Sequence, residues 1–306
     1  MYLGICIWTM MRNPPYQDTV KKIGDIGFRG VELIAWSREA VSDYYTAPTC
    51  RELRGIIADK GMTLTNFNHN SLAMTSEDPQ ARLYARETFR RVIEAAHALG
   101  SKSVTTTTPY PFGLMPDNFP KVVDIPQMPM LEVRADIRRD WNANWNLFVD
   151  EMGVYCQMAA QAGLRMLVEA HPHRWIYSTD SLLRLVENVK ADNLGFNFDP
   201  SHLFHCGELP QCSIYRAGKA IGHVHISDND TYTNAHWQPG QGKMDWKAML
   251  QAFSDIGYDG ALSIELENVP GCAGRDRLMT DEMYGQLALS AKFMRTLGKE
   301  MGIPVE

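Results

Sequence analysis

The hydrophobic positions of this chain recur in a fixed order, in which a helix-like stretch ends at a glycine and a short apolar or β-branched run follows. This order is found at residues 25–34, 59–67, 98–106, 161–168 and 255–266. Glycine suits a helix end because it enters the left-handed backbone region without a Cβ penalty. The runs that follow are too short for helices and are typical of buried parallel strands.

Eight such runs qualify as strands, and helical patterns separate them. The strand candidates lie near residues 3–8, 30–34, 62–67, 102–107, 164–169, 194–198, 221–226 and 261–266. The clearest helices are predicted at 78–99, 141–162, 246–256 and 280–299. A doubly wound open sheet usually has a glycine-rich turn after its first strand, and this sequence has none. We therefore predict an α/β fold, a (β/α)8 TIM barrel formed by residues 1–306 as a single domain.

One segment does not follow this alternation of strands and helices. Residues 108–138 hold six prolines, with phenylalanines and methionines between them. The segment follows the fourth predicted strand and so lies at the barrel end where active sites form. It is predicted to be an inserted loop, and both a substrate lid and a subunit contact fit its composition.

Charge and composition narrow the functional classes. The chain has 30 Lys+Arg against 36 Asp+Glu, a formal net charge of −6, and 45% hydrophobic residues. This composition is that of a globular protein with a buried core rather than a disordered chain. Binding to a nucleic-acid backbone normally requires a basic surface, so we expect no nucleic acid as partner.

The location of the protein is predicted from what the sequence lacks. No apolar run approaches the ~18 residues of a membrane span, and residues 1–8 do not have the features of a signal peptide. The six cysteines are scattered, and none forms a C-x-x-C pair. We expect reduced thiols in a cytoplasmic protein that has no membrane partner.

Polar side chains gather where the last four predicted strands end. These ends contain Glu169, Asp199, His225 and Glu265, and the residues that alternate with them are apolar. Because side chains alternate along a strand and the carboxyl ends of barrel strands converge, these four can face the barrel mouth together. Three carboxylates in one low-dielectric mouth would repel unless some were protonated or a cation bound them.

This set of donors predicts a metal site. Oxygen-rich ligation with a single imidazole favours Mn²⁺, and also permits Mg²⁺ or Co²⁺, over a thiolate-type zinc site. Four protein ligands on a six-coordinate ion leave two positions for adjacent hydroxyl and carbonyl oxygens. The competing interpretation is that each residue is an isolated polar strand end with its own hydrogen bonds.

Four motifs resemble a known family. Residues 197–202, 223–225, 239–246 and 257–265 are similar to those of the xylose isomerase-like barrel superfamily, which includes ketose 3-epimerases. The resemblance implies one divalent metal held by Glu169, Asp199, His225 and Glu265. It also implies that Glu169 and Glu265 exchange substrate protons from opposite faces while His202 contacts the substrate.

The implied reaction is isomerisation or epimerisation of a sugar. A metal on the carbonyl and neighbouring hydroxyl oxygens acidifies the C–H between them and stabilises an enediolate. The chain departs from the epimerases at two positions that hold substrate, with Trp175 in place of a glutamate and Thr231 in place of an arginine. His171 shares a strand face with Glu169, and we predict it as an additional acid or base.

A second chemistry fits the same residues. Some members of the superfamily cleave 3-oxo-glycosides by β-elimination, among them the catalytic subunits of C-glycoside deglycosidases. The aromatic residues Trp141 and Trp145 and the 108–138 segment could accommodate a larger aglycone. A resemblance to endonuclease IV is weaker, because Asn234 stands where its ligand pattern has an aspartate.

The remaining candidates concern substrate and partners. Trp8, Glu32, His69 and His236 are predicted to contact substrate from the barrel mouth, together with His202. We expect a small sugar, oxidised sugar or glycoside as substrate and no nucleotide cofactor, since no dinucleotide or phosphate loop is present. We also expect a homo-oligomer, or a hetero-oligomer with a small subunit if the protein is a deglycosidase. A non-catalytic sugar-binding barrel is the alternative outside enzymes.

Overall fold

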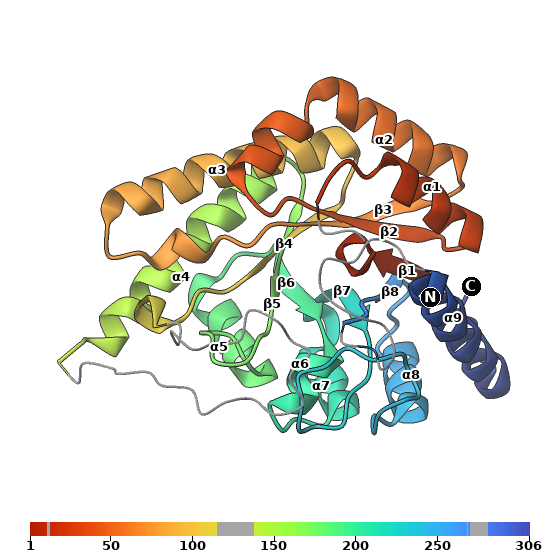
Figure 1. The fold of residues 1–306 in the computed structure, drawn as a ribbon. Helices are drawn as coiled ribbons and strands as arrows, with labels where there is room; N and C mark the ends of the chain where they lie inside the picture. Colours follow the sequence, from red (N-terminus) through yellow and green to blue (C-terminus); the bar gives the residue numbers. More distant parts are fainter. Residues whose placement is uncertain (11–12, 115–137, 268, 270–280) are drawn as a thin grey trace.

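Eight parallel strands close into a barrel in the computed structural model, which describes residues 1–10, 13–114, 138–267, 269 and 281–306 (Figure 1). Each strand pairs with the next, and β1 pairs with β8 through Tyr2 opposite Ala261. The strands are β1 Tyr2–Cys6, β2 Gly30–Ile34, β3 Thr63–Asn68, β4 Ser103–Thr107, β5 Arg165–Glu169, β6 Leu194–Phe198, β7 Ile221–Ile226 and β8 Ala261–Ile264. The predicted fold class is confirmed.

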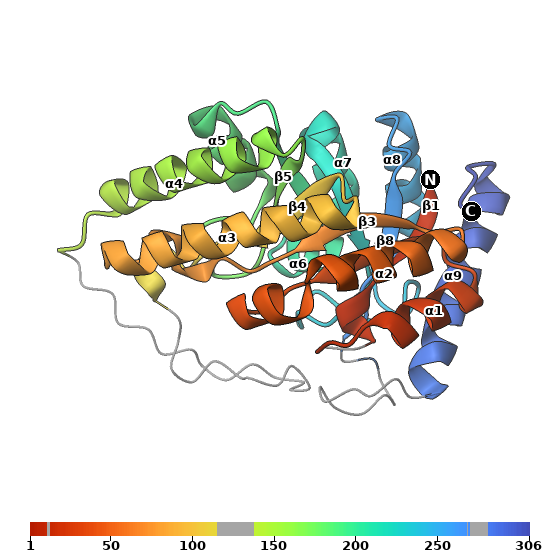
Figure 2. The ribbon, with the colours of Figure 1, turned by 90° about the horizontal axis from the view of Figure 1, so that it is seen from above.

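Helices surround the barrel, and α3 and α4 lie side by side along one flank in both views (Figures 1 and 2). The helices are α1 Gln17–Ile26, α2 Ala47–Asp59, α3 Pro79–Leu99, α4 Trp141–Gln161, α5 Thr179–Val189, α6 Pro200–His205, α7 Pro210–Ala217, α8 Trp246–Asp255 and α9 Asp281–Met301. The two ends of the chain meet, because the N–H of Leu3 donates to the carbonyl oxygen of Glu306 at 2.7 Å.

Local sequence signals account for the bounds of the helices. The side chain of Asp78 accepts a hydrogen bond from the N–H of Gln80, and Pro79 occupies the first position of α3. The helix ends at Gly100, whose φ of 82° is left-handed. The side chain of Asp140 caps α4 in the same way by accepting from the N–H of Ala143.

The barrel separates an apolar layer from a polar interior. Val168, Phe198 and Val224 alternate with the site residues, have no exposed surface and belong to the core against the helices. Inside the barrel, Asn66 donates to Oγ1 of Thr105 at 2.7 Å and is itself fully buried. Buried polar groups require such partners, because an unpaired one costs about 1–3 kcal/mol.

Two strands end earlier than the sequence predicts. β1 ends at Cys6, and Ile7–Thr9 form a 3-10 turn, so Trp8 lies in that turn and not in the strand. β8 ends at Ile264, and the N–H of Leu266 donates to Oγ1 of Thr9 at 3.0 Å. This contact joins the two strand ends at the carboxyl end of the barrel.

Most of the predicted insertion at 108–138 falls in the part of the chain outside the described residues, so its role as lid or subunit contact stays a prediction. Among the helices that the structure does describe, none combines the length and apolar character needed to cross a membrane.

Candidate metal centre and active site

Four neighbouring strands bring the predicted ligands together. Glu169 is the last residue of β5, Asp199 follows β6 directly, His225 lies near the end of β7, and Glu265 follows β8. One ligand atom from each lies within 4.8 Å of those of the others. All four are nearly or fully buried, with exposed fractions of 0–5%. The structure therefore places these residues as the alternation of the strands predicts.

His225 lies between carboxylates on both of its ring nitrogens. Its Nδ1 is 2.7 Å from Oε1 of Glu169 and 2.7 Å from Oε2 of Glu265. Its Nε2 is 2.9 Å from Oε2 of Glu32. Two neighbours orient the outer carboxylates: Trp8 donates a hydrogen bond from Nε1 to Oε1 of Glu265, and Asn197 donates to Oε1 of Glu169 at 3.3 Å.

The pKa shifts follow from this concentration of buried charge. Burial raises the pKa of Glu169, and the carboxylates of Glu265 and Asp199 raise it further, against an opposing effect of His225. Burial lowers the pKa of His225, but Glu32, Glu265 and Glu169 outweigh it and hold that pKa well above its ordinary value. Without a cation, the protonated forms of His225 and Glu169 are therefore favoured, because the surrounding carboxylates stabilise positive charge at this point.

These residues fit a divalent cation. One N–H of His225 cannot satisfy both Oε1 of Glu169 and Oε2 of Glu265, which each lie 2.7 Å from Nδ1, and Oε2 of Glu265 has no other hydrogen-bond partner in the described part of the chain. A buried carboxylate oxygen without a partner is costly unless a cation or a donor satisfies it. Three carboxylates with one imidazole nitrogen form the oxygen-rich donor set that Mn²⁺ and Mg²⁺ prefer.

A row of three histidines extends from the ligands along one side of the mouth. The rings of His171 and His202 lie 3.9 Å apart between centroids, and those of His202 and His236 lie 4.8 Å apart. Oδ2 of Asp199 is 3.2 Å from Nε2 of His236 and 3.7 Å from Nε2 of His202. Nδ1 of His202 in turn lies 2.8 Å from the side-chain oxygen of Asn234.

Asp199 thus faces both the four-ligand group and the histidine row. Its pKa would rise on burial, but His202, His236 and His225 lower it below the ordinary value. Asp199, His202 and His236 also form a second group whose donor atoms lie within 4.8 Å of one another. His171 approaches the first group with Nδ1 3.9 Å from Oε2 of Glu169.

Two residues predicted to contact substrate bond to other groups in the structure, and their contact with substrate stays a prediction. Glu32 is in the middle of β2, has no exposed surface and bonds to Nε2 of His225, on the far side of that ring from Glu169 and Glu265. His69 follows β3, is 5% exposed, and has Nδ1 2.8 Å from the carbonyl oxygen of Ala35. Within the described residues, no contact joins His69 to the four ligands.

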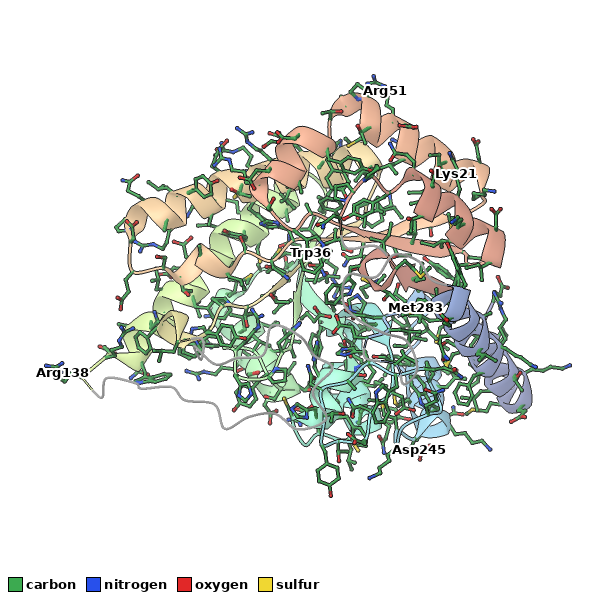
Figure 3. The ribbon with its side chains drawn as sticks, viewed as in Figure 1. Lys21, Trp36, Arg51, Arg138, Asp245 and Met283 are labelled. Carbon is green, nitrogen blue, oxygen red and sulfur yellow. The ribbon has the colours of Figure 1, made fainter. Side chains whose placement is uncertain are left out.

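Sequence reasoning missed three contributors to the site. Trp36 pairs with Trp8 at 4.9 Å between ring centroids, and it lies near the middle of the molecule in Figure 3. His223 places Nε2 2.7 Å from Oε2 of Glu32. Asn234 orients His202. Strand alternation indicated the inward position of His223, but Trp36 and Asn234 reach the mouth through loops, whose path the strand pattern does not define.

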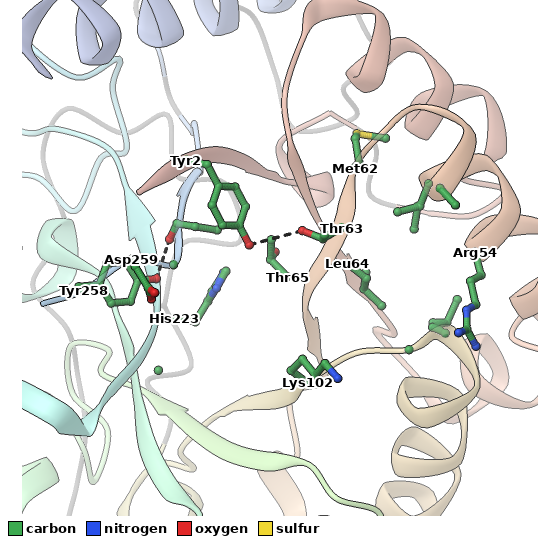
Figure 4. Close-up of a pocket in the computed structure, with 17 residues that line it drawn as sticks. Tyr2, Arg54, Met62, Thr63, Leu64, Thr65, Lys102, His223, Tyr258 and Asp259 are labelled. Atoms are coloured by element: carbon green, nitrogen blue, oxygen red, sulfur yellow. Dashed lines mark hydrogen bonds between the residues drawn. The ribbon is translucent and has the colours of Figure 1, made fainter. Parts of the chain in front are cut away.

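A separate hollow lies at the opposite end of the barrel, with a volume of about 610 Å³ (Figure 4). It is lined by residues at the beginnings of strands, including Tyr2, Thr63 and Ala261, and by Lys102. Active sites of this fold lie at the other end, and the four-ligand group is absent from this lining. We therefore assign the chemistry to the mouth and not to this hollow.

Comparison with known proteins agrees with this geometry. Residues 20–289 match the family described as xylose isomerase-like TIM barrel. The chain belongs to this family. The first curated relatives align over only 40–49% of their own length.

Three proteins illustrate the likeness. An inosose dehydratase of Clostridium botulinum is 24% identical over 296 residues, which are 89% of this chain and 91% of that protein. The structure of D-psicose 3-epimerase with D-tagatose from Clostridium cellulolyticum H10 has a TM-score of 0.73 at 18% identity, covering 97% of this chain and 99% of that one. A structure of the IOLI protein with a binding zinc atom has a TM-score of 0.72 at 20% identity, covering 98% and 99%.

Proposed function

We propose that this protein is a divalent-metal-dependent isomerase or epimerase of a small sugar, acting by proton abstraction next to a carbonyl. The observation that carries the proposal is the convergence of Glu169, Asp199, His225 and Glu265 within 4.8 Å at the carboxyl ends of four strands. Membership in the xylose isomerase-like family and the likeness to a D-psicose 3-epimerase support the same class of reaction.

The four residues would hold one ion, with Mn²⁺ preferred and Mg²⁺ or Co²⁺ as alternatives. The likeness to a protein whose structure has a binding zinc atom supports metal binding by this fold. When bound, the ion would polarise a substrate carbonyl and its neighbouring hydroxyl and so acidify the C–H between them.

Glu169 and Glu265 are proposed to exchange the substrate proton. They come from β5 and β8, which β6 and β7 separate, yet each places an oxygen 2.7 Å from the same nitrogen of His225. Burial raises the pKa of Glu169, so this carboxylate is a base whose pKa lies nearer to neutrality than that of an exposed carboxylate. Trp8 and Asn197 fix the orientation of the two carboxylates through their hydrogen bonds.

Hydrogen exchange into substrate tests this proposal directly. We expect the protein with Mn²⁺ in D₂O to place deuterium at one carbon beside the carbonyl of its substrate, across a panel of ketoses, inososes and 3-oxo-glycosides. Glu169→Gln and Glu265→Gln should each reduce exchange by about 10²–10⁴-fold, because each removes a proton-transfer group. Glu94→Gln, which changes an exposed carboxylate on α3, should retain the wild-type rate.

Wild-type exchange rates in both site variants would contradict the two-carboxylate mechanism. Folding of each variant is checked by its melting temperature without metal, so that a loss of exchange is not confused with unfolding.

A β-elimination on a 3-oxo-glycoside or related oxidised sugar is the second candidate, favoured by His171. Nδ1 of His171 is buried and has no hydrogen-bond partner in the described part of the chain. Burial, together with His202 and Arg174, holds the pKa of His171 well below its ordinary value, so the ring is neutral and one of its nitrogens carries a lone pair. The likeness to an inosose dehydratase supports an elimination.

Product analysis separates the two reactions. Elimination releases a leaving group and forms an unsaturated product, whereas epimerisation conserves the mass of the substrate. His171→Gln should abolish release of the leaving group in the first case, and should leave deuterium exchange measurable in the second. A small partner subunit would accompany the elimination reaction only.

A further inference from the structure

The carboxylate of Glu32 is the most completely enclosed charged group beside the proposed metal centre. It lies in the middle of β2 with no exposed surface. Oε2 lies 2.9 Å from Nε2 of His225 and 2.7 Å from Nε2 of His223. Oε1 accepts from the side-chain amide of Asn68 at 3.4 Å and faces Sγ of Cys6 at 3.7 Å.

A carboxylate buried as deeply as that of Glu32 requires neighbouring groups that offset its loss of hydration. Moving a carboxylate out of water costs several kcal/mol unless donors surround it. All four neighbours of Glu32 can donate a proton, and two of them are imidazoles on one strand, β7. The neighbouring interior of the barrel uses neutral groups instead, as in the bond from Ser103 to Asn66 at 2.7 Å. A charged group at this position is therefore not needed to fill the barrel.

The geometry around His225 shows what the charge does. A neutral imidazole carries its single proton on one ring nitrogen, and a carboxylate beside Nε2 places the proton there. Nδ1 lies on the other side of the ring, 2.7 Å from an oxygen of both Glu169 and Glu265, so with a cation among these carboxylates its lone pair would face that cation. A ligand histidine is commonly held in this way by a carboxylate on its far nitrogen, which fixes the ring and raises its basicity.

We propose that Glu32 is a positioning residue that holds His225 with its proton on Nε2, so that Nδ1 is the ligand atom of the metal centre. His223 completes the arrangement by fixing the other side of the same carboxylate oxygen. This inference rests on the proposed metal centre and adds a residue from the opposite side of the barrel that touches neither metal nor substrate.

Metal affinity tests the proposal without reference to turnover. Glu32→Gln preserves the size of the side chain and removes its charge. We expect it to weaken Mn²⁺ binding, measured by titration calorimetry, by about 10–100-fold. Ser103→Ala, a change at another buried polar position of the same barrel whose hydroxyl bonds to Asn66, should bind Mn²⁺ as the wild type does.

The electronic absorption spectrum of the Co²⁺-loaded protein provides a second readout. Loss of the bond to Nε2 should shift the visible bands in Glu32→Gln but not in Ser103→Ala, because the bands report the ligand field at the ion. An unshifted spectrum with unchanged affinity in Glu32→Gln would overturn the inference. A thiolate-to-cobalt charge-transfer band in the wild type that Cys6→Ser removes would also overturn it, since the ion would then lie among Cys6, Glu32 and His225.

The wild-type protein provides the test if Glu32→Gln does not fold. Nitrogen-15 NMR of histidine-labelled protein with Mg²⁺ should show His225 protonated at Nε2 and not at Nδ1; the reverse assignment contradicts the proposal. Failure of the proposed function remains distinguishable, because a wild type that binds Mn²⁺ but exchanges no substrate proton leaves the positioning role of Glu32 intact.

Discussion

The two halves of the barrel supply different side chains to the same mouth. Strands β5–β8 end in Glu169, Asp199, His225 and Glu265, whereas β1–β4 supply no member of that group. The first half instead contributes Glu32 behind His225 and, from the turn after β1, Trp8 beside Glu265. Residues of β5–β8 form the group itself, whereas the first half of the barrel adds only neighbours that orient His225 and Glu265, although all eight strands pair in the same parallel manner.

The largest expected difference is between alanine substitutions of two histidines at strand ends, His225 in the second half of the barrel and His69 in the first. His225→Ala should abolish detectable Mn²⁺ binding and reduce turnover by at least about 10³-fold, because it removes a ligand from the centre. His69→Ala should leave Mn²⁺ affinity within about threefold of the wild type, since His69 bonds to Ala35 and not to the ligands. Titration calorimetry on both variants measures the contrast.

Equal losses of Mn²⁺ affinity in the two variants would remove the distinction between the halves. A rise in KM with unchanged metal affinity in His69→Ala would instead assign it to substrate binding, as the sequence predicts.

The next prediction concerns the pH dependence of Mn²⁺ affinity, which arises from Glu169 and His225 in the second half of the barrel. The pKa values of Glu169 and His225 are both raised, so each holds a proton more firmly than usual as pH falls. Binding of the ion expels such protons, and affinity should therefore fall by about tenfold per pH unit for each proton released as pH drops below neutrality. Calorimetry of Mn²⁺ binding at several values between pH 5.5 and 8 measures the slope.

The sign of this dependence is fixed by the direction of the shifts. Stabilisation by the metal is fully present at the higher pH and is lost as pH falls, because protonated ligands favour the metal-free protein. A Mn²⁺ affinity that is flat across this range would show that neither group carries a proton that the ion must displace.

The smallest expected effect tests whether Trp8, in the first half of the barrel, orients Glu265. Trp8→Phe keeps the aromatic contact with Trp36 and removes the hydrogen bond to Glu265. A hydrogen bond to a charged group contributes about 1.5–3 kcal/mol, and part of this should remain because the ion also orients Glu265. We expect kcat to fall by about three- to tenfold with little change in KM, measured by steady-state kinetics with Mn²⁺.

The sequence predicts the fold and the convergence of Glu169, Asp199, His225 and Glu265 because both depend on short periodicities. The glycine joins and the helix caps at Asp78 and Asp140 are local signals, and the predicted bounds of α3 agree with the structure within about one residue. Strand alternation likewise indicates which residues face the mouth, since a shift of one position would bury Glu169 against the helices.

The remaining parts of the site depend on distances that no local pattern encodes. Glu32 is predicted at the mouth because it lies on an inward face, but its depth is set by the stagger of β2 relative to β7. The turn that begins at Ile7 ends β1 early, and Trp8 in this turn bonds to Glu265 while Thr9 accepts from Leu266 across the barrel end, a contact between residues far apart in sequence. Asn234 reaches His202 from a loop.

The most direct test of the metal centre is titration of the metal-free protein with Mn²⁺, followed by calorimetry and by the melting temperature in parallel. The account predicts one ion for each chain and a melting temperature that rises with Mn²⁺, corresponding to about 2.7 kcal/mol at one hundred times the dissociation constant. Absence of binding, with a melting temperature that responds to neither Mn²⁺ nor Mg²⁺, would contradict it.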